Sequence, residues 1–443
     1  MSDASRKHPF LRAVLCLLTV CLLAPVTSSD AGAATLRKTA PEPAATLLLP
    51  YFEQDLSNSR GPTTLFTVNN ASNQAVLAHL VIWSDLSVPV LDFNIYLTGY
   101  DMQTFNLRDM LVNGLLPQTA SAGQDPNDTI SPKGAFSQDV NFASCTGLLP
   151  TPPLPASFIQ HLQLSLTGKP SPLLGNNCAG RDLGDNIARG YITVDTVQNC
   201  TLRFPGDVGY FGPGGTGDAT DQNVLWGDYV YVNQSAGTSE GNPLVHIVAD
   251  AADPETTTPG QYTFYGRYVG WSAADNRRPL ATNFAAPYIN GGPSAGSTSL
   301  IVWRDSKVNQ SAFACPATPS SRPSWYFLGQ EGIRIFDEQE HPAVPPSFPL
   351  SPAPPGGFAP FPAEAQRVAV GGPLFPVPFD SGWIDLDLNT TVTPAGAVPP
   401  ADPAAAQAWV AVKMSAGGTF TVGYDATQLD NAAHAIHSVG SLP

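Results

Sequence analysis

Apolar and polar residues alternate along much of this chain, and this alternation predicts β-strands. The clearest case is the segment 90–107 (VLDFNIYLTGYDMQTFNL). On a strand, its alternate residues Leu91, Phe93, Ile95 and Leu97 share one face. Upstream, segments 63–70 and 76–86 are rich in β-formers, and an Asn-Ala-Ser-Asn turn at 70–73 lies between them. The order of strand, turn and strand predicts a sandwich of short antiparallel strands.

The strand pattern occurs twice. LLLPYFEQ (47–54) followed by TTLFTVNN (63–70) matches FAAPYING (284–291) followed by TSLIVWRD (298–305). IARGYITVDT (187–196) and AQAWVAVKMS (406–415) suggest a second matching pair. Duplicated strand frameworks indicate tandem β domains. We therefore predict an all-β fold of two tandem, elaborated immunoglobulin-like β-sandwich units with long loop insertions.

The pattern also sets expected domain bounds. Residues 1–33 are predicted to be a signal peptide, because basic residues precede a short apolar core (13–24) and an Ala-Gly-Ala exit at 31–33. The first unit is expected at 34–278, with an insertion at 112–186 and a β-hairpin extension at 201–278. The second unit is expected at 279–443, with a Pro-rich excursion at 341–362.

Three segments carry more local expectations. Residues 158–168 (FIQHLQLSLTG) fit a strand or a short helix, and 262–271 (YTFYGRYVGW) fits a strand. Only the C-terminal segment 430–438 has a helical pattern without an alternative.

Composition limits the partners. The net charge of −15 argues against nucleic acid and anionic membranes, which attract clusters of Lys and Arg. After the signal peptide no apolar run is long enough to span a bilayer, so we expect a secreted, periplasmic or cell-surface protein. Its partner would be an unknown protein or a glycan at the cell surface.

The cysteines fit an exported protein. Cys145, Cys178, Cys200 and Cys315 remain after signal removal, and they predict two disulfides with three alternative connectivities. The most local pairing joins Cys145 to Cys178, which leaves Cys200 to Cys315. No C-x-x-C spacing is present, so a zinc ribbon or a redox dithiol is not indicated.

Five long segments carry a resemblance to known proteins: 63–72, HLVIWSDLSVPVLDFNIYLTGYD (79–101), YGRYVGWS (265–272), IVWRDSKVNQSAFACP (301–316) and GQEGIRIFDEQEHP (329–342). They resemble a family of uncharacterised bacterial exported proteins. The resemblance covers most of the mature chain. It implies export and an immunoglobulin-like β-sandwich framework, but it implies no catalytic residues.

Aromatic residues in the extension are the candidate ligand site. An exposed strip of tyrosine and tryptophan could stack on sugar rings, whereas cross-strand packing is the alternative. Because alternation places Tyr229 and Tyr231 on one face, such a strip is feasible. The candidate binding residues are Trp226, Tyr229, Tyr231, Tyr265 and Trp271.

A candidate cation site follows one strand. Asp385, Asp387 and Asn389 alternate with apolar residues, so their oxygens would line one face and could hold calcium. A solvated strand face is the alternative, and no other cofactor is indicated.

One catalytic motif occurs in the sequence, but the secondary structure expected around it does not fit the motif. Gly237-Thr238-Ser239-Glu240-Gly241 matches the G-x-S-x-G nucleophile elbow, but an Asn-Pro and a strand follow it instead of a helix. We therefore expect a hairpin tip there. His434 and His437 have metal-ligand spacing but no third ligand nearby.

The sequence thus favours a non-catalytic exported protein that acts through binding or surface structure. A carbohydrate-binding or carbohydrate-processing protein is the alternative.

Overall fold

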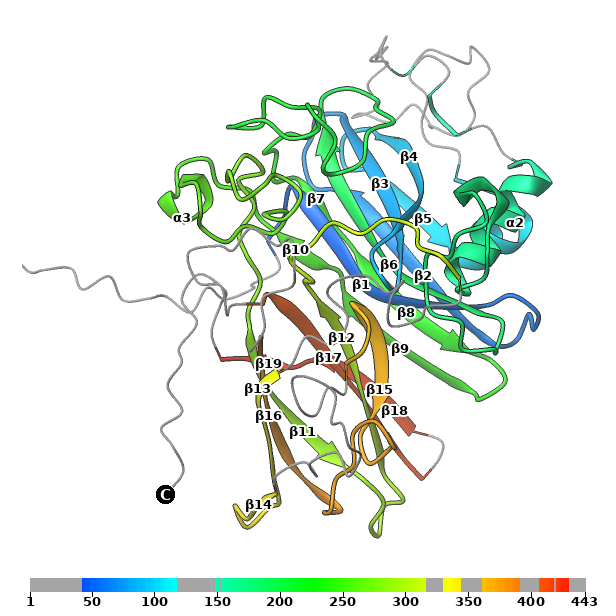
Figure 1. Cartoon of the computed structure of the whole chain (residues 1–443), viewed down its shortest axis with the longest axis vertical. Coiled ribbons are helices and arrows are strands. Elements are labelled where there is room, and N and C mark those ends of the chain that lie inside the picture. Colours follow the sequence, from blue (N-terminus) through cyan, green and yellow to red (C-terminus); the bar gives the residue numbers. More distant parts are fainter. Residues whose placement is uncertain are drawn as a thin grey trace, which may run out of the picture. The chain divides into compact units, whose positions relative to one another are not determined.

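Four antiparallel sheets carry the fold (Figure 1). The computed structural model describes residues 42–117, 145, 148–150, 153–315, 330–343, 361–390, 406–417 and 420–429. The expected signal peptide, most of the Pro-rich excursion, and the C-terminal segment with His434 and His437 lie outside these residues.

The first sandwich has two sheets, which we name sheet A and sheet B. Sheet A contains, in spatial order, β5 (Met102–Asn106), β2 (Pro62–Asn70), β8 (Asp228–Asn233) and β9 (Thr238–Pro243), with β7 (Leu225–Trp226) paired to β2. Sheet B contains, in spatial order, β10 (Val245–Ile247), β1 (Thr46–Asp55), β6 (Ile187–Val197), β3 (Val76–Ser84) and β4 (Pro89–Leu97).

The second sandwich follows in the chain as sheets C and D. Sheet C contains β15 (Ala365–Ala369), β12 (Ser297–Arg304), β17 (Ala408–Ala416) and β18 (Phe420–Asp425). Sheet D contains β19 (Thr427–Gln428), β11 (Asn283–Ile289), β16 (Ser381–Thr390), β13 (Gln330–Phe336) and β14 (Pro342–Ala343).

The two sandwiches share one topology. Sheet C repeats the order of sheet A, since β15-β12-β17-β18 corresponds to β5-β2-β8-β9. Sheet D repeats sheet B in the same way, with β19-β11-β16-β13-β14 corresponding to β10-β1-β6-β3-β4. Apart from the short β7, corresponding strands follow the same order along the chain. The predicted tandem β-sandwiches are therefore confirmed, whereas their immunoglobulin-like character stays a prediction.

The topology corrects one of the repeats expected from sequence. Strand β6 (with GYITVDT, 190–196) corresponds to β16 (with GWIDLDL, 382–388), not to β17. Both strands need their glycine, because a Cβ would lie 1.9 Å from the Trp83 carbonyl oxygen at Gly190 and 1.8 Å from that of Phe336 at Gly382. The match between 187–196 and 406–415 reflects shared apolar content only.

Sheet C is buried on both faces. Leu300 and Val302 of β12 belong to the core of the second sandwich, whereas Ile301 and Trp303 join the core of the first. Strands β12 and β15 contact β1 of sheet B, and β15 also contacts β6. The sheets therefore pack in the order A, B, C, D. This burial on both sides explains the uninterrupted apolar run at 300–303, which a half-exposed strand would break with polar residues.

Helices are few and short in the described part of the chain. The segment that fitted a strand or a helix forms α2 (Ala156–Leu166), since its apolar residues Phe158, Leu162 and Leu166 recur every four positions. The expectation that only the C-terminal segment 430–438 is helical without an alternative is therefore too narrow, because 156–166 is helical as well. The remaining helical turns are η2 (Asp109–Asn113), η4 (Pro172–Leu174) and α3 (Pro254–Thr257).

The strand expected at 262–271 is wrong. This segment consists of turns, and Gly270 and Trp271 have left-handed φ angles of 61° and 59°. A strand requires extended backbone, so these residues interrupt any ladder.

Two disulfides form, as predicted, but the local pairing is wrong. Cys145 bonds to Cys200, and Cys178 bonds to Cys315. Proximity along the chain misleads here because the insertion folds back on the sandwich: the backbone at Cys178 bridges to Phe313, which brings Cys315 within reach. Disulfides indicate an oxidising compartment. In the described residues, no helix has the length and apolar character that a membrane span requires.

Candidate functional site

Four of the five candidate aromatic residues are buried. Tyr229, Tyr231, Tyr265 and Trp271 have almost no exposed surface, whereas Trp226 is 41% exposed. These four side chains therefore pack within the protein, and the exposed strip that the sequence offered as one alternative is not formed by them.

Tyr229 and Tyr231 do share one face of β8, but that face points into the core. The Tyr231 hydroxyl donates a hydrogen bond to the Tyr51 carbonyl oxygen at 2.6 Å, and the Tyr229 and Tyr231 rings pack edge to face. Burial raises the pKa of both hydroxyls. The residue between them, Val230, points outward.

Tyr265 and Trp271 lie in loops that cover sheet B. The Tyr265 hydroxyl donates to Asp195 Oδ2 at 3.0 Å, and the Tyr210 hydroxyl donates to the same atom at 2.8 Å. The Trp271 ring packs against Tyr262. These rings hold the loops in place and are not available for stacking on a ligand.

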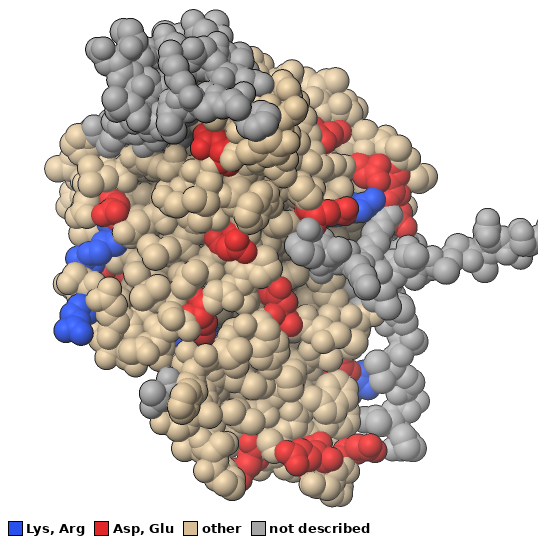
Figure 2. All heavy atoms as spheres, turned by 180° about the vertical axis from the view of Figure 1, so that it is seen from behind, with Lys and Arg blue, Asp and Glu red and all other residues tan. Residues whose placement is uncertain are grey.

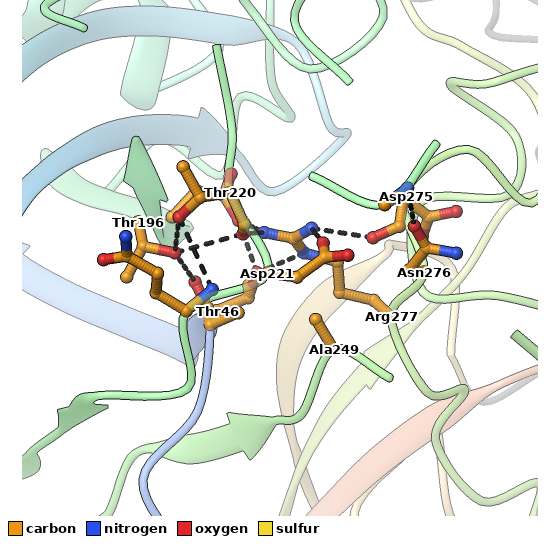
Figure 3. A network of polar contacts seen from close by, with 12 residues as sticks. Thr46, Thr196, Thr220, Asp221, Ala249, Asp275, Asn276 and Arg277 are labelled. Carbon is orange, nitrogen blue, oxygen red and sulfur yellow. Dashed lines mark hydrogen bonds and ion pairs between the residues drawn. The ribbon is translucent and has the colours of Figure 1, made fainter. Parts of the chain in front are cut away.

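A buried arginine organises the same loops (Figure 3). Arg277 donates from Nε to Thr46 Oγ1 at 3.0 Å and from Nη2 to the Thr220 carbonyl oxygen at 2.8 Å. Its Nη1 donates to Asp221 Oδ1 at 3.1 Å and to the Asp275 carbonyl oxygen at 2.7 Å. Because these donors are used within the protein, the cluster is structural rather than a binding site.

A second buried arginine joins the two sandwiches. Arg267 pairs with both carboxylate oxygens of Glu364, and its Nη1 lies 3.3 Å from Asp305 Oδ1. Its Nη2 also donates to Ser87 Oγ at 3.1 Å. Burial raises the pKa of Glu364, and the Arg267 guanidinium opposes this shift.

The candidate calcium residues each have a protein partner. Ile384, Leu386 and Leu388 of β16 point into the core, so the polar residues do share the opposite face, as expected. Asp385 pairs with Arg334 at 3.1 Å. Asn389 Oδ1 accepts the Ala406 N–H at 3.2 Å, and Asp387 Oδ1 accepts the Asn389 N–H at 3.1 Å. No group of three or more His, Cys, Asp or Glu suited to a metal occurs among the described residues.

The G-x-S-x-G motif forms a hairpin, as expected. Gly237 lies in the turn between β8 and β9, and Ser239 is the second residue of β9, opposite Val232. His79 and His246 also lie in strands, where the Nδ1 of His79 contacts Asn94 Oδ1 at 3.1 Å. Neither histidine pairs with Ser239 in the described strands.

The outer face of sheet A, which we call the A face, carries a pocket of about 590 Å³. It is lined by Leu65, Phe66, Thr67, Gln103, Thr104, Phe105, Asn106, Asp109, Met110, Leu115, Leu116, Pro117, Asp228 and Val230. Strand alternation explains its floor. Phe66 and Tyr229 point into the core, so their neighbours Leu65 and Val230 point out, and these two are cross-strand partners.

One wall of the pocket is the segment that follows β5. The chain turns through η2 and Gly114, whose φ of 69° is left-handed, and then returns along Leu115 to Pro117. Helix α2 fixes this wall, because Gln163 Nε2 donates to the Leu111 carbonyl oxygen at 3.0 Å. The pocket is thus built on regular strands and a supported turn.

The A face carries several exposed apolar side chains. Its exposed apolar side chains are Leu65, Met102, Trp226 and Val230. Met102 and Trp226 both pair with Asn69 of β2, so they lie in one row across the sheet. The sequence held this signal, because β2 and β8 have apolar residues at positions of both parities. Clustered aromatic residues do not mark this face, because most of them are buried.

The internal repeat identifies the counterpart of the A face. The hydroxyl of Thr64 accepts the Glu53 N–H and donates to its carbonyl oxygen, and the hydroxyl of Thr298 makes the same two bonds to Ile289. These threonines are therefore equivalent, and the match of 63–70 to 298–305 expected from the sequence, which sets Thr63 on Thr298, is wrong by one residue.

Asn69 and Trp303 each lie five residues after their threonine on the equivalent strands β2 and β12, so these two positions are equivalent as well. Their cross-strand partners, Trp226 and Trp409, are then equivalent too. Trp409 is 5% exposed, because sheet C uses this face to pack on the first sandwich. Trp226 thus stands at a position that is an interface position in the second sandwich.

Surface charge is acidic on the side of the molecule that Figure 2 shows. Asp and Glu are scattered over it, and Lys and Arg are few. No basic patch suited to a phosphate backbone is visible on that side.

Comparison with protein-family models, curated proteins and solved structures finds no match.

Proposed function

We propose that the protein is an exported, non-catalytic binding protein that engages its partner through the A face. The observation that carries this proposal is the pair Trp226 and Trp409. Equivalent positions of the repeat hold tryptophan in both sandwiches, one in an interface and one exposed.

The composition of the A face supports binding. Tryptophan and methionine are enriched in protein interfaces, and exposed apolar patches mark interaction sites. The pocket beside Leu65 and Val230 has the size of a site for a large side chain or a small molecule. Export is supported by the two disulfides, because such bonds persist in oxidising compartments.

The test is site-specific photo-crosslinking in the producing cell. A photoreactive amino acid at Val230 should give a discrete adduct, and the substitution Trp226→Glu should abolish it. The control position is Val422 of β18, which is 52% exposed but lies outside the A face. The proposal is overturned if Val230 gives no adduct, or if Val422 gives the same adducts.

A carbohydrate-binding role is the second candidate, and the exposed Trp226 ring is the observation that favours it. The polar side chains of Gln103 and Asn106 also line the pocket. A glycan array would decide this case. A sugar ligand whose binding is lost with Trp226→Ala would support it, and an array without hits would count against it.

A further inference from the structure

The internal interface between the sandwiches has two faces, and each has a free counterpart. The donor face is the outer side of sheet C, with Ile301, Trp303 and Trp409. The acceptor face is the outer side of sheet B, where Tyr191 meets Trp303 edge to face with ring centroids 6.0 Å apart. Since sheet A is equivalent to sheet C, the A face is the free counterpart of the donor face.

The free counterpart of the acceptor face is the outer side of sheet D, which we call the D face. Within the aligned segments GYITVDT and GWIDLDL, Tyr191 is equivalent to Trp383. Their cross-strand partners Trp83 and Phe336 are also equivalent.

The aromatic pair is kept in both copies. The Trp83 and Tyr191 rings stack with centroids 5.8 Å apart, and the Phe336 and Trp383 rings stack with centroids 4.7 Å apart. In the first sandwich, Trp303 and Tyr268 cover this pair. In the second sandwich Trp383 is 38% exposed, so the corresponding pair is open.

We propose that two copies of this chain associate head to tail, with the A face of one copy docking on the D face of the next. The contact would repeat the packing of sheet C on sheet B, with Trp226 placed as Trp409 is and Trp383 placed as Tyr191 is. The proposal rests on the A face being a binding surface, and it names a second copy as the occupant.

The order of the sheets gives the physical reason. Within one chain the sheets pack as A, B, C and D, and C is equivalent to A. Placing A of a second copy on D therefore continues the same series. Such an interface joins two different surfaces, so it forms chains or rings rather than a closed twofold dimer.

This contact should be weaker than the internal one. The position of Glu364, just before β15, corresponds to Asp101 just before β5, and Asp101 is bonded to the Thr98 N–H instead of to an arginine. The position of Trp303 is held by the smaller Asn69. A reversible, concentration-dependent association is therefore expected.

The experiment is sedimentation velocity on the oxidised mature protein over a concentration series. Two variants each remove one face: Trp226→Glu disables the A face, and Trp383→Glu disables the D face. Each should lower the apparent association constant by about 30-fold, the loss typical of an interface hot spot. Val422→Glu is the matched control and should associate like the parent.

Mixing the two variants gives the decisive result. Trp226→Glu keeps an intact D face and Trp383→Glu keeps an intact A face, so an equimolar mixture can form one interface and should yield a dimer. A parent protein that stays monomeric up to about 1 mM would overturn the proposal. Association that survives both substitutions, or a mixture that stays monomeric, would also overturn it.

The same measurements separate this proposal from the proposed function. An A-face crosslink to a different molecule, with no crosslink between copies, overturns head-to-tail association and leaves the A face as a binding surface. Absence of any A-face adduct overturns both. Circular dichroism and melting of each variant must match the parent, because both tryptophans are exposed enough for glutamate to be tolerated.

Discussion

Removing the Arg267 side chain should destabilise the protein strongly. The guanidinium is 2% exposed and the Glu364 carboxylate is fully buried, so neither charge can turn to water. The substitution Arg267→Met keeps an unbranched apolar stem but deletes the charge. It leaves the carboxylates of Glu364 and Asp305 buried with one cation fewer.

The expected cost is about 3–5 kcal/mol of unfolding free energy, the range for breaking a buried ion pair by removing one partner. The matched control is Arg203→Met. Arg203 also pairs with an aspartate, Asp218 at 2.9 Å, but its side chain is 50% exposed. Water replaces its partner, so this control should cost at most about 1 kcal/mol.

Equilibrium urea unfolding of the oxidised protein, followed by tryptophan fluorescence, measures both variants. The double variant Arg267→Met with Glu364→Gln should recover part of the loss, since the neutral amide is cheaper to bury than an unpaired carboxylate. A loss for Arg267→Met no larger than that of the exposed control would contradict this prediction. A double variant that loses the sum of the two single effects would contradict it as well.

Three further predictions follow from buried groups. Burial raises the pKa of Asp275 to about 6, so the protonated carboxyl stabilises the folded protein fully below about pH 4 and this stabilisation is lost as the pH rises through 6. The substitution Asp275→Asn should therefore reduce the change in unfolding free energy between pH 4 and 7, measured by urea unfolding, by about 3 kcal/mol. Replacing Cys178 and Cys315 by serine should cost about 2–5 kcal/mol, and non-reducing peptide mapping should recover Cys145 with Cys200; a Cys145–Cys178 peptide would contradict the fold. Tyr231→Phe should cost about 0.5–1.5 kcal/mol through loss of its bond to Tyr51, and Tyr231→Ala about 3–5 kcal/mol through a cavity, both measured by urea unfolding.

Strand positions could be predicted from the sequence because alternation is a local property. Ile384, Leu386 and Leu388 reach the core of the second sandwich as their spacing predicts. Alternation also placed Tyr229 and Tyr231 on the same face. It could not say which face meets solvent, because both faces of β8 hold apolar residues and only tertiary packing decides between them.

The disulfide pairing and the correspondence between strands could not be predicted from the sequence, because both depend on contacts between distant segments. The disulfide partners Cys178 and Cys315 are 137 residues apart, and the chain path that joins them depends on how the insertion folds back. The correspondence of β6 with β16 was hidden as well. Strands β6 and β17 are both apolar, and only the order of strands in the sheets shows that β17 matches β8.

The two end faces of the sheet series explain why the apolar surface of this protein calls for a partner. Stacked repeats normally end in units whose outer surface is polar, because nothing covers them. The D face follows this rule in part, because the Arg334–Asp385 pair and Asp387 lie on the same face of sheet D as Trp383. The A face departs from it, since Leu65, Met102, Trp226 and Val230 are all exposed there. Burying apolar side chains is favourable in proportion to the area removed from water, so an A face that stays open leaves Trp226 without the burial that the equivalent Trp409 gains in sheet C. A face that only needed to be soluble would place polar side chains at these positions, and the cheapest explanation for their absence is a molecule that covers them.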